Sequence, residues 1–398
     1  FLERILWFQD EINKQILYEY GLKMANSLFK RGPDAGGIWT DTKSGLVFSH
    51  RRLSIRDLSQ KGAQPMKSHD NNLVIIFNGE IYNFEELKNE LNLNKWESNS
   101  DTEVLLAAIQ EWGLEYALRK SYGMFSFALW NIKENSLVIA RDRFGEKPLY
   151  WGRLKLKNHQ KPILAFASDL SSFWALPGLV KEIEYSAFTS FLKYGYVCGP
   201  DSIQKDIYQL NPGHFVKIIK NNESLVSNLP IPKKWWDVKE ISSTLFSNQT
   251  DNCNTLILED TLKNIIREQS LADVPSASFL SGGIDSSLIA ALLQNQSSKK
   301  IRTYNISFPS FGNGEELFNE GPYAKKIADY LGTDHTELGI SAEDIKKIIP
   351  KIPEIYSEPF ADVSQLATSI ICKEISNCNI KVALTGDGAD ELFGGYNR

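Results

Sequence analysis

The stretch Ser278-Phe279-Leu280-Ser281-Gly282-Gly283-Ile284-Asp285-Ser286-Ser287-Leu288 determines the fold of the second half of this chain. The apolar run 277–280 predicts a strand, the Ser, Gly and Asp residues predict a tight loop, and the apolar spacing that follows predicts a helix. Free N–H groups and the positive end of the helix dipole meet at such a helix N-terminus, which therefore suits an anion. The Asp285 carboxylate, placed where phosphate would sit, predicts a divalent cation between the two.

The loop is not a Walker loop, because it has no Lys and its spacing is too short. Instead, SGGIDSS at 281–287 resembles the pyrophosphate-binding loop of the ATP pyrophosphatases, which cleave ATP to AMP and pyrophosphate. The alternative is a Ser/Gly turn that only caps a core helix. The strand before the loop, the Asp within it and the helix after it favour the nucleotide site.

A second acidic loop, 385–391, follows the apolar residues 382–384 in the same way. It offers Asp387, Asp390 and Glu391, and these carboxylates could hold Mg²⁺ against pyrophosphate if they faced Asp285. The alternative is a solvated acidic turn. We expect the two loops to meet at one edge of a parallel sheet, where ligands sit beyond the carboxyl ends of the strands.

Residues 255–398 alternate helices and strands, which predicts an α/β domain with a mostly parallel sheet. Residues 1–220 instead contain aromatic and β-branched strand patterns with two clear helices, 84–91 and 102–112. This pattern predicts an α+β domain of packed antiparallel sheets that carry helices. The predicted strands are 45–50, 73–78, 124–130, 137–141, 163–168 and 215–219. The polar segment 221–254 predicts a linker, in which Trp235 and Trp236 would dock onto a neighbouring surface.

The composition excludes several classes of protein. The formal net charge of −5, without any basic run, argues against nucleic-acid binding. No stretch reaches the length of uncharged apolar residues that a membrane span needs. The four Cys (Cys198, Cys253, Cys372 and Cys378) form no CxxC pair, so zinc and a disulfide framework are not expected and a cytoplasmic location fits.

Taken together, the motifs resemble the glutamine-hydrolysing asparagine synthetase family over nearly the whole chain. In the second half they are SGGIDSS at 281–287, EPFADVSQLAT at 358–368 and TGDGADELFGGY at 385–396. In the first half they are RGPD at 31–34, HRRLSI at 50–55, GAQPM at 62–66, NGEIYN at 78–83, SDTE at 100–103 and RDRFGEKPLY at 141–150.

The resemblance implies a class II glutamine amidotransferase domain with an N-terminal-nucleophile fold, followed by an ATP-pyrophosphatase domain. Glutamine would be hydrolysed to glutamate and ammonia, and the ammonia would travel inside the protein. ATP would adenylate the β-carboxylate of aspartate, and ammonia would displace AMP to give asparagine. A closed route keeps the ammonia from being protonated in water. The substrates would be glutamine, aspartate and ATP with Mg²⁺, and the sequence leaves a homodimer open.

By the same resemblance, Arg52 would hold the glutamine carboxylate, and Glu80 and Asp101 would orient its amino group and amide. The Asn78 side chain and the Gly79 N–H would form an oxyanion hole. ATP would be bound by Leu280 and Ile306 at the adenine and by Ser281, Gly282, Gly283, Asp285, Ser286, Ser287, Thr385 and Gly386. Asp285 and Asp390 would bind the metal. Asp387 would take part in adenylation, although the family often carries the longer Glu at this place.

The sequence departs from the family at both ends. The family's nucleophile is an N-terminal Cys whose α-amine serves as base, yet no Cys precedes Cys198. We therefore expect a fragment that lacks the N-terminal Cys and the C-terminal part, and no thiol-dependent glutaminase activity from it. Two other functions stay open: an amidotransferase for another carboxylate, such as a sugar uronate, and a nucleotide-binding module that has lost catalysis.

Overall fold

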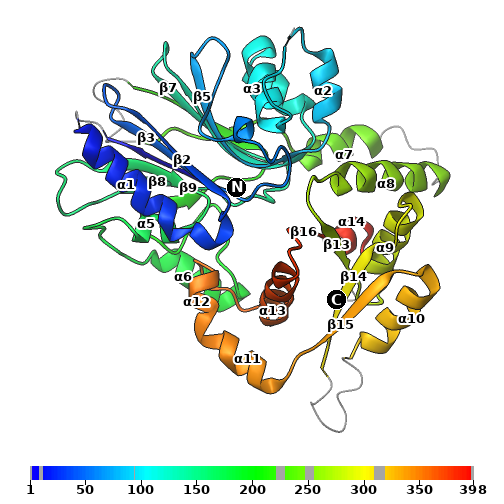
Figure 1. The fold of residues 1–398 in the computed structure, drawn as a ribbon. Helices are drawn as coiled ribbons and strands as arrows, with labels where there is room; N and C mark the ends of the chain where they lie inside the picture. The colour runs from blue at the N-terminus through cyan, green and yellow to red at the C-terminus, as the bar shows by residue number, and fades with distance from the viewer. Residues whose placement is uncertain are drawn as a thin grey trace. The chain divides into compact units, whose positions relative to one another are not determined.

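The computed structural model describes residues 2–8, 12–93, 95–220, 229–246, 255–308 and 319–395. The chain divides into two compact units (Figure 1). Unit 1 comprises Phe1–Thr250 and the short segment Tyr356–Ala361, and unit 2 comprises Asp251–Ile355 and Asp362–Arg398. Among the residues described, no helix is long and apolar enough to cross a membrane.

Unit 1 contains two six-stranded sheets whose paired strands are all antiparallel. In spatial order, the first sheet contains β10 (Ile207–Gln209), β8 (Tyr150–Leu154), β9 (Ile163–Ala167), β1 (Leu2–Trp7), β3 (Leu46–Arg52) and β2 (Ala35–Asp41). The second contains β12 (Lys233–Lys234), β11 (His214–Ile219), β7 (Ser136–Arg141), β6 (Gly123–Asn131), β5 (Leu73–Ile81) and β4 (Met66–Lys67).

The two sheets pack face to face, because one buried cluster takes Trp7, Phe48 and Phe166 from the first sheet and Ile76 and Trp130 from the second. The helices α1 (Lys14–Ser27) and α5 (Ser171–Trp174) cover the outer face of the first sheet. The outer face of the second is covered by α2 (Phe84–Glu90), α3 (Asp101–Trp112) and α4 (Leu114–Lys120) (Figure 1). The predicted sandwich of antiparallel sheets carrying helices is confirmed.

The expectation of only two clear helices in this half is wrong. The residues that α1 buries are Leu17, Tyr20, Gly21, Met24 and Ala25, which recur every three or four positions. This is the spacing of an amphipathic helix, although Lys, Glu and Gln between them lower the mean hydropathy of the segment. The helix α6 (Tyr185–Tyr194) also forms and ends at Gly195, whose φ of 82° is the left-handed conformation that favours glycine.

The predicted helix at 102–112 corresponds to α3, which begins one residue earlier. Ser100 caps it, because the Ser100 hydroxyl accepts a hydrogen bond of 3.2 Å from the Thr102 N–H. The cap places Asp101 in the first turn of the helix. This local geometry fixes one of the predicted site residues.

Unit 2 is built on a four-stranded sheet in which every pair of neighbouring strands is parallel. The spatial order is β15 (Asp334–Gly339), β14 (Arg302–Ser307), β13 (Ser276–Phe279) and β16 (Val382–Leu384). The connecting and flanking helices are α8 (Thr255–Ser270), α9 (Ile284–Gln296), α10 (Gly321–Leu331), α11 (Ala342–Ile348), α12 (Ile352–Ile355), α13 (Ser364–Asn377) and α14 (Ala389–Phe393). The predicted parallel sheet is therefore confirmed.

Part of the predicted linker 221–254 has regular structure. The strand β12 pairs with β11, and the helix α7 (Val238–Phe246) follows it. Trp235 is buried in the apolar cluster under α2, α3 and α4, and its indole N–H donates to the Arg141 carbonyl at 3.2 Å. Residues 221–228 and 247–254 lie outside the described residues. The domain boundaries themselves stay a prediction.

Candidate active sites

The serine loop of unit 2 (residues 281–287) follows β13 and includes the first turn of α9, so a strand, a turn and a helix follow one another as predicted. The hydroxyl oxygens of Ser281 and Ser286 are 2.8 Å apart, and the Ser281 hydroxyl also accepts a bond of 3.2 Å from the Gly283 N–H. Gly282 has a φ of 83°, and a Cβ there would lie 2.7 Å from the Cβ of Tyr323. Glycine is therefore required at this position both by the backbone conformation and by the space.

One polar atom of this loop suggests a ligand. The Ser287 hydroxyl oxygen is buried and has no hydrogen-bond partner among the residues described. It lies in the first turn of α9, where backbone N–H groups have no partner within the helix. A phosphate oxygen would satisfy such a hydroxyl and such N–H groups together. The residues present therefore fit the pyrophosphate part of a nucleotide.

The acidic loop of unit 2 (residues 385–391) lies directly beside the serine loop. β13 and β16 are neighbouring parallel strands with Ser278 opposite Leu384, so the two loops leave the sheet at the same edge. A Cβ added at Gly386 would lie 2.9 Å from the Cβ of Asp285 and 3.0 Å from the Ser286 nitrogen. The loops are thus in van der Waals contact at Gly386.

The acids of this loop are arranged by local contacts. The Thr385 hydroxyl donates a hydrogen bond of 2.9 Å to a carboxylate oxygen of Asp387, which is exposed. Gly395 packs on the Asp390 carboxylate after the left-handed Gly394, which has a φ of 74°. The chain thus turns at Gly394 and Gly395, near the end of the TGDGADELFGGY motif, and Tyr396 lies outside the described residues.

Asp285 and Asp390 are the predicted metal ligands. In the part of the chain that the structure describes, no group of three or more His, Cys, Asp or Glu side chains is arranged to hold a metal ion. Mg²⁺ commonly uses one or two carboxylates together with substrate phosphates, so two acids fit an ion that arrives with a nucleotide.

The predicted adenine contacts lie on the same sheet. Leu280 is 1% exposed and packs with Ala290, Ala324 and Ala328, while its N–H donates 2.9 Å to the Tyr304 carbonyl on β14. Ile306 is half-buried farther along β14. Leu280 therefore directly follows β13, and Ile306 lies on the neighbouring strand β14.

Unit 1 holds the residues predicted for glutamine. Arg52, at the end of β3, is 3% exposed, and its guanidinium donates to the backbone carbonyls of Ser59 at 2.9 Å, Arg56 at 3.1 Å and Asp57. A Cβ on Gly62 would collide with this guanidinium, 2.3 Å from a terminal nitrogen. The loop after β3 thus fixes the orientation of Arg52.

Glu80 and Asp101 lie together in a charged cluster. The Asp101 carboxylate accepts the Ile81 N–H at 2.8 Å, and a buried carboxyl oxygen of Glu80 lies 3.3 Å from the Arg56 Nε. Burial, followed by the nearby charge of Asp101, raises the pKa of Glu80 to about 8. Glu80 therefore holds a proton over much of the neutral range.

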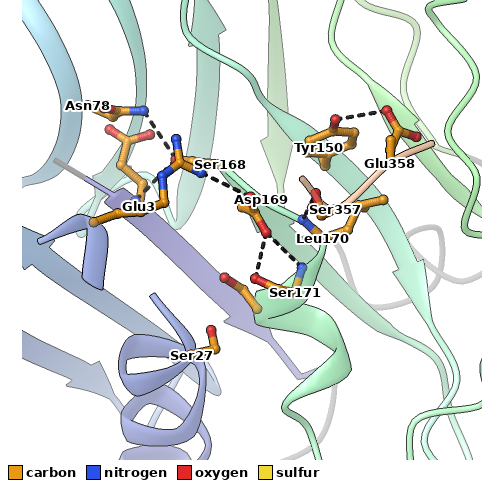
Figure 2. Close-up of polar contacts among 12 residues, drawn as sticks. Glu3, Ser27, Asn78, Tyr150, Ser168, Asp169, Leu170, Ser171, Ser357 and Glu358 are labelled. Carbon is orange, nitrogen blue, oxygen red and sulfur yellow. Dashed lines mark hydrogen bonds and ion pairs between the residues drawn. The ribbon is translucent and has the colours of Figure 1, made fainter. Parts of the chain in front are cut away.

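Asn78 and Gly79 lie toward the C-terminal end of β5. Asn78 is opposite Ser126 on β6, and its side-chain amide donates to the Ser168 hydroxyl at 3.4 Å (Figure 2). A Cβ at Gly79 would lie 2.1 Å from the Met124 carbonyl oxygen, so only glycine fits there. The structure thus brings the predicted oxyanion-hole residues and the charged pair Glu80 and Asp101 to one end of β5.

Four further residues of this site were missed by the sequence reasoning. Arg56 pairs with Glu80 and stacks over Phe84 at 4.7 Å, and Gln64 accepts the Phe77 N–H at 2.6 Å. Arg56 directly follows the HRRLSI motif and Gln64 lies within the GAQPM motif, so these motifs could have pointed to both residues. Ser168 and Glu3 reach the site through strand pairing between distant parts of the chain, which no local pattern reveals.

Comparison with known proteins identifies a family for each half of the chain. The glutamine amidotransferase domain family matches residues 9–236, and the asparagine synthase family matches residues 257–398. Asparagine synthetase [glutamine-hydrolyzing] 1 of Bacillus subtilis (strain 168) is 34% identical over 393 residues, which are 98% of this chain and 56% of that protein. The chain thus spans about half the length of this relative.

Two other relatives show the range of similarity. Putative asparagine synthetase [glutamine-hydrolyzing] 2 of Methanocaldococcus jannaschii is 30% identical over 408 residues, covering 96% of this chain and 73% of that protein. Amidase chry2 of Gibberella zeae is 29% identical over 401 residues, covering 96% of this chain and 56% of that protein.

Proposed function

Because the chain belongs to the glutamine-hydrolysing asparagine synthetase family, we propose that the protein it represents amidates L-aspartate to L-asparagine at the expense of ATP. Unit 2 would bind ATP and aspartate, transfer AMP to the β-carboxylate and release pyrophosphate. Ammonia, obtained from glutamine by unit 1, would then displace AMP from the β-aspartyl-AMP intermediate. The products are asparagine, AMP, pyrophosphate and glutamate.

The observation that supports the proposal most strongly is the contact between the serine loop and the acidic loop at Gly386. The serine loop offers hydroxyls and helix N–H groups to pyrophosphate, including the Ser287 hydroxyl that lacks a protein partner among the described residues. The acidic loop offers Asp387 and Asp390 beside it. Mg²⁺, when bound through Asp285 and Asp390, would neutralise charge on the departing pyrophosphate.

In unit 1, the residues support the binding of a zwitterionic amino acid. Arg52 would receive the glutamine carboxylate, because backbone carbonyl oxygens fix the orientation of its guanidinium. Burial lowers the pKa of Arg52. The charges of four nearby acids oppose this effect, and these acids are Asp57, Asp101, Asp34 and Glu80. Asp101 and Glu80 would receive the ammonium group, and Asn78 and Gly79 the amide oxygen.

Incorporation of labelled pyrophosphate into ATP tests the proposal. We expect exchange that depends on Mg²⁺ and aspartate and that is lost in Asp285→Asn, with Asp273→Asn as a matched control outside both loops. Exchange with a sugar uronate but not with aspartate would favour the other amidotransferase. Binding of Mg–ATP without exchange for any carboxylate would favour a nucleotide-binding module, and both results contradict the proposal.

A further inference from the structure

Glu3 is a completely buried acid on β1, beside the residues proposed for the oxyanion hole of unit 1. A carboxyl oxygen of Glu3 accepts a hydrogen bond of 3.4 Å from the Ser126 hydroxyl. The Glu3 N–H donates to the Ser168 hydroxyl at 3.2 Å, and the Asn78 amide donates to this same hydroxyl at 3.4 Å (Figure 2). Glu3 and Asn78 therefore converge on one small polar site.

The position of the Glu3 carboxyl group follows from the strand register. Ser126 is directly opposite Asn78 in the β5–β6 pair, and Gly79 is the next residue on β5. The Glu3 carboxyl also receives a hydrogen bond from the Asn78 backbone. It is thus held by the strand pair whose Asn78 amide and Gly79 N–H are proposed to receive the amide oxygen of glutamine.

The carboxyl group is incompletely satisfied. Its second oxygen has no hydrogen-bond partner among the described residues, which is unfavourable for a buried acceptor. Burial, the largest effect, raises the pKa of Glu3 well above its ordinary value and so favours the neutral form of the group. A neutral glutamic acid side chain has nearly the same length, shape and acceptor oxygen as the side chain of glutamine.

We propose that Glu3 fills the amide subsite of unit 1 in the free protein, so that glutamine enters only when the Glu3 side chain leaves. The inference rests on the proposed binding of glutamine in unit 1. Glu3 acts as an internal competitor: the apparent affinity for glutamine is the intrinsic affinity multiplied by the fraction of molecules in which the subsite is empty. A substitution that empties the subsite should therefore strengthen the binding of glutamine.

Calorimetric titration of L-glutamine into matched variants tests this. We expect Glu3→Ala to bind glutamine at least about tenfold more tightly than the unaltered chain, since an occupancy of nine-tenths already gives that factor. Glu3→Gln still fills the subsite with a group of the same size, so its affinity should stay near that of the unaltered chain. Equal affinity in the unaltered chain and Glu3→Ala, or equal tightening in both variants, would overturn the inference.

The additional substitution Arg52→Ala separates this inference from the proposed function. If Arg52→Ala abolishes glutamine binding but Glu3→Ala leaves it unchanged, the proposed glutamine site is supported and the role of Glu3 is refuted. If no variant binds glutamine, both are refuted. Should Glu3→Ala not fold, carbon NMR of the unaltered chain decides. The Glu3 carboxyl resonance, assigned by its absence in Glu3→Gln, must shift on saturation with glutamine, and an unchanged resonance contradicts displacement.

Discussion

Replacement of Asp142 by Ala should destabilise unit 1, because this one side chain satisfies several backbone N–H groups. Asp142 is 1% exposed and lies just after β7. Its carboxylate accepts backbone N–H groups from Phe125 at 3.1 Å and from Phe144, Glu146 and Lys147 at 3.0 Å each. One side chain thus links β6 to the loop of the RDRFGEKPLY motif.

The magnitude follows from which of these N–H groups can reach water. Phe144 and Glu146 are exposed, so water can replace the carboxylate there at little cost. Phe125 is 0% exposed, and its N–H would be left without a partner at a cost of about 1–3 kcal/mol. Lys147 is half-buried and adds about 1 kcal/mol. We expect Asp142→Ala to lower the free energy of unfolding of unit 1 by about 2–4 kcal/mol.

Urea unfolding followed by tryptophan fluorescence measures this change for unit 1 alone, because all 9 Trp residues lie between Trp7 and Trp236. Asp70→Ala is the matched control. The Asp70 carboxylate likewise accepts hydrogen bonds within a turn, from the Ser68 hydroxyl at 2.6 Å and from the Asn72 N–H at 3.0 Å. Because Asp70 is exposed, its replacement should lower the free energy of unfolding by less than about 1 kcal/mol. Equal losses for the two variants would refute the argument from burial.

Three further substitutions have defined outcomes. Ser100→Ala removes the cap of α3 and should lower the free energy of unfolding by about 1 kcal/mol in the same assay, and no change would contradict the capping role. Glu80 has a pKa of about 8 in the folded state, above its ordinary 4.5, so between these pH values the folded state binds a proton that the unfolded state has lost. The free energy of unfolding should therefore fall as the pH rises from about 4.5 to about 8. Glu80→Gln should remove this contribution to the pH dependence, which urea unfolding at a series of pH values measures. A slope that is the same in both proteins would refute the assignment. Gly386→Ala should separate the two nucleotide loops and weaken Mg–ATP binding about tenfold by calorimetry. The control Gly199→Ala lies in unit 1, where the nearest atom to the added Cβ would be 3.7 Å away, so it should leave this binding unchanged; equal effects would argue against the contact.

The architecture could be predicted where the hydrophobic pattern is local. The alternation of strand and helix after residue 255 was sufficient for the parallel sheet, and the Ser-Gly loop and the acidic loop then had to leave one edge of it. The edge strand β15 was overlooked because Asp334, Thr336, Glu337 and Gly339 are exposed and it has no apolar run. The charged cluster around Glu80 was predicted by motif resemblance, while the pairing with Arg56 needed the structure.

Glu358 shows why the rest could not be predicted. In the sequence it opens the EPFAD motif before α13, which suggests a role in the second domain. In the structure its carboxylate accepts the Tyr150 hydroxyl at 2.9 Å (Figure 2). It also accepts the Ile203 N–H at 2.8 Å and the Gln209 side-chain amide at 3.2 Å, and all three partners lie within unit 1. Burial raises the pKa of Glu358.

These partners lie about 150 to 210 residues away along the chain, so no periodicity or local motif connects them. The short segment Tyr356–Ala361 belongs to unit 1 although the residues on both sides of it belong to unit 2. Its Ser357 hydroxyl accepts the Leu170 N–H at 3.3 Å, two residues from Ser168, whose hydroxyl is shared by Glu3 and Asn78. Replacement of Ser357 by Ala would therefore act first on the turn at 168–170 that supports the proposed glutamine site. A loss of glutamine binding with intact Mg–ATP binding would distinguish this role from a direct role at the nucleotide.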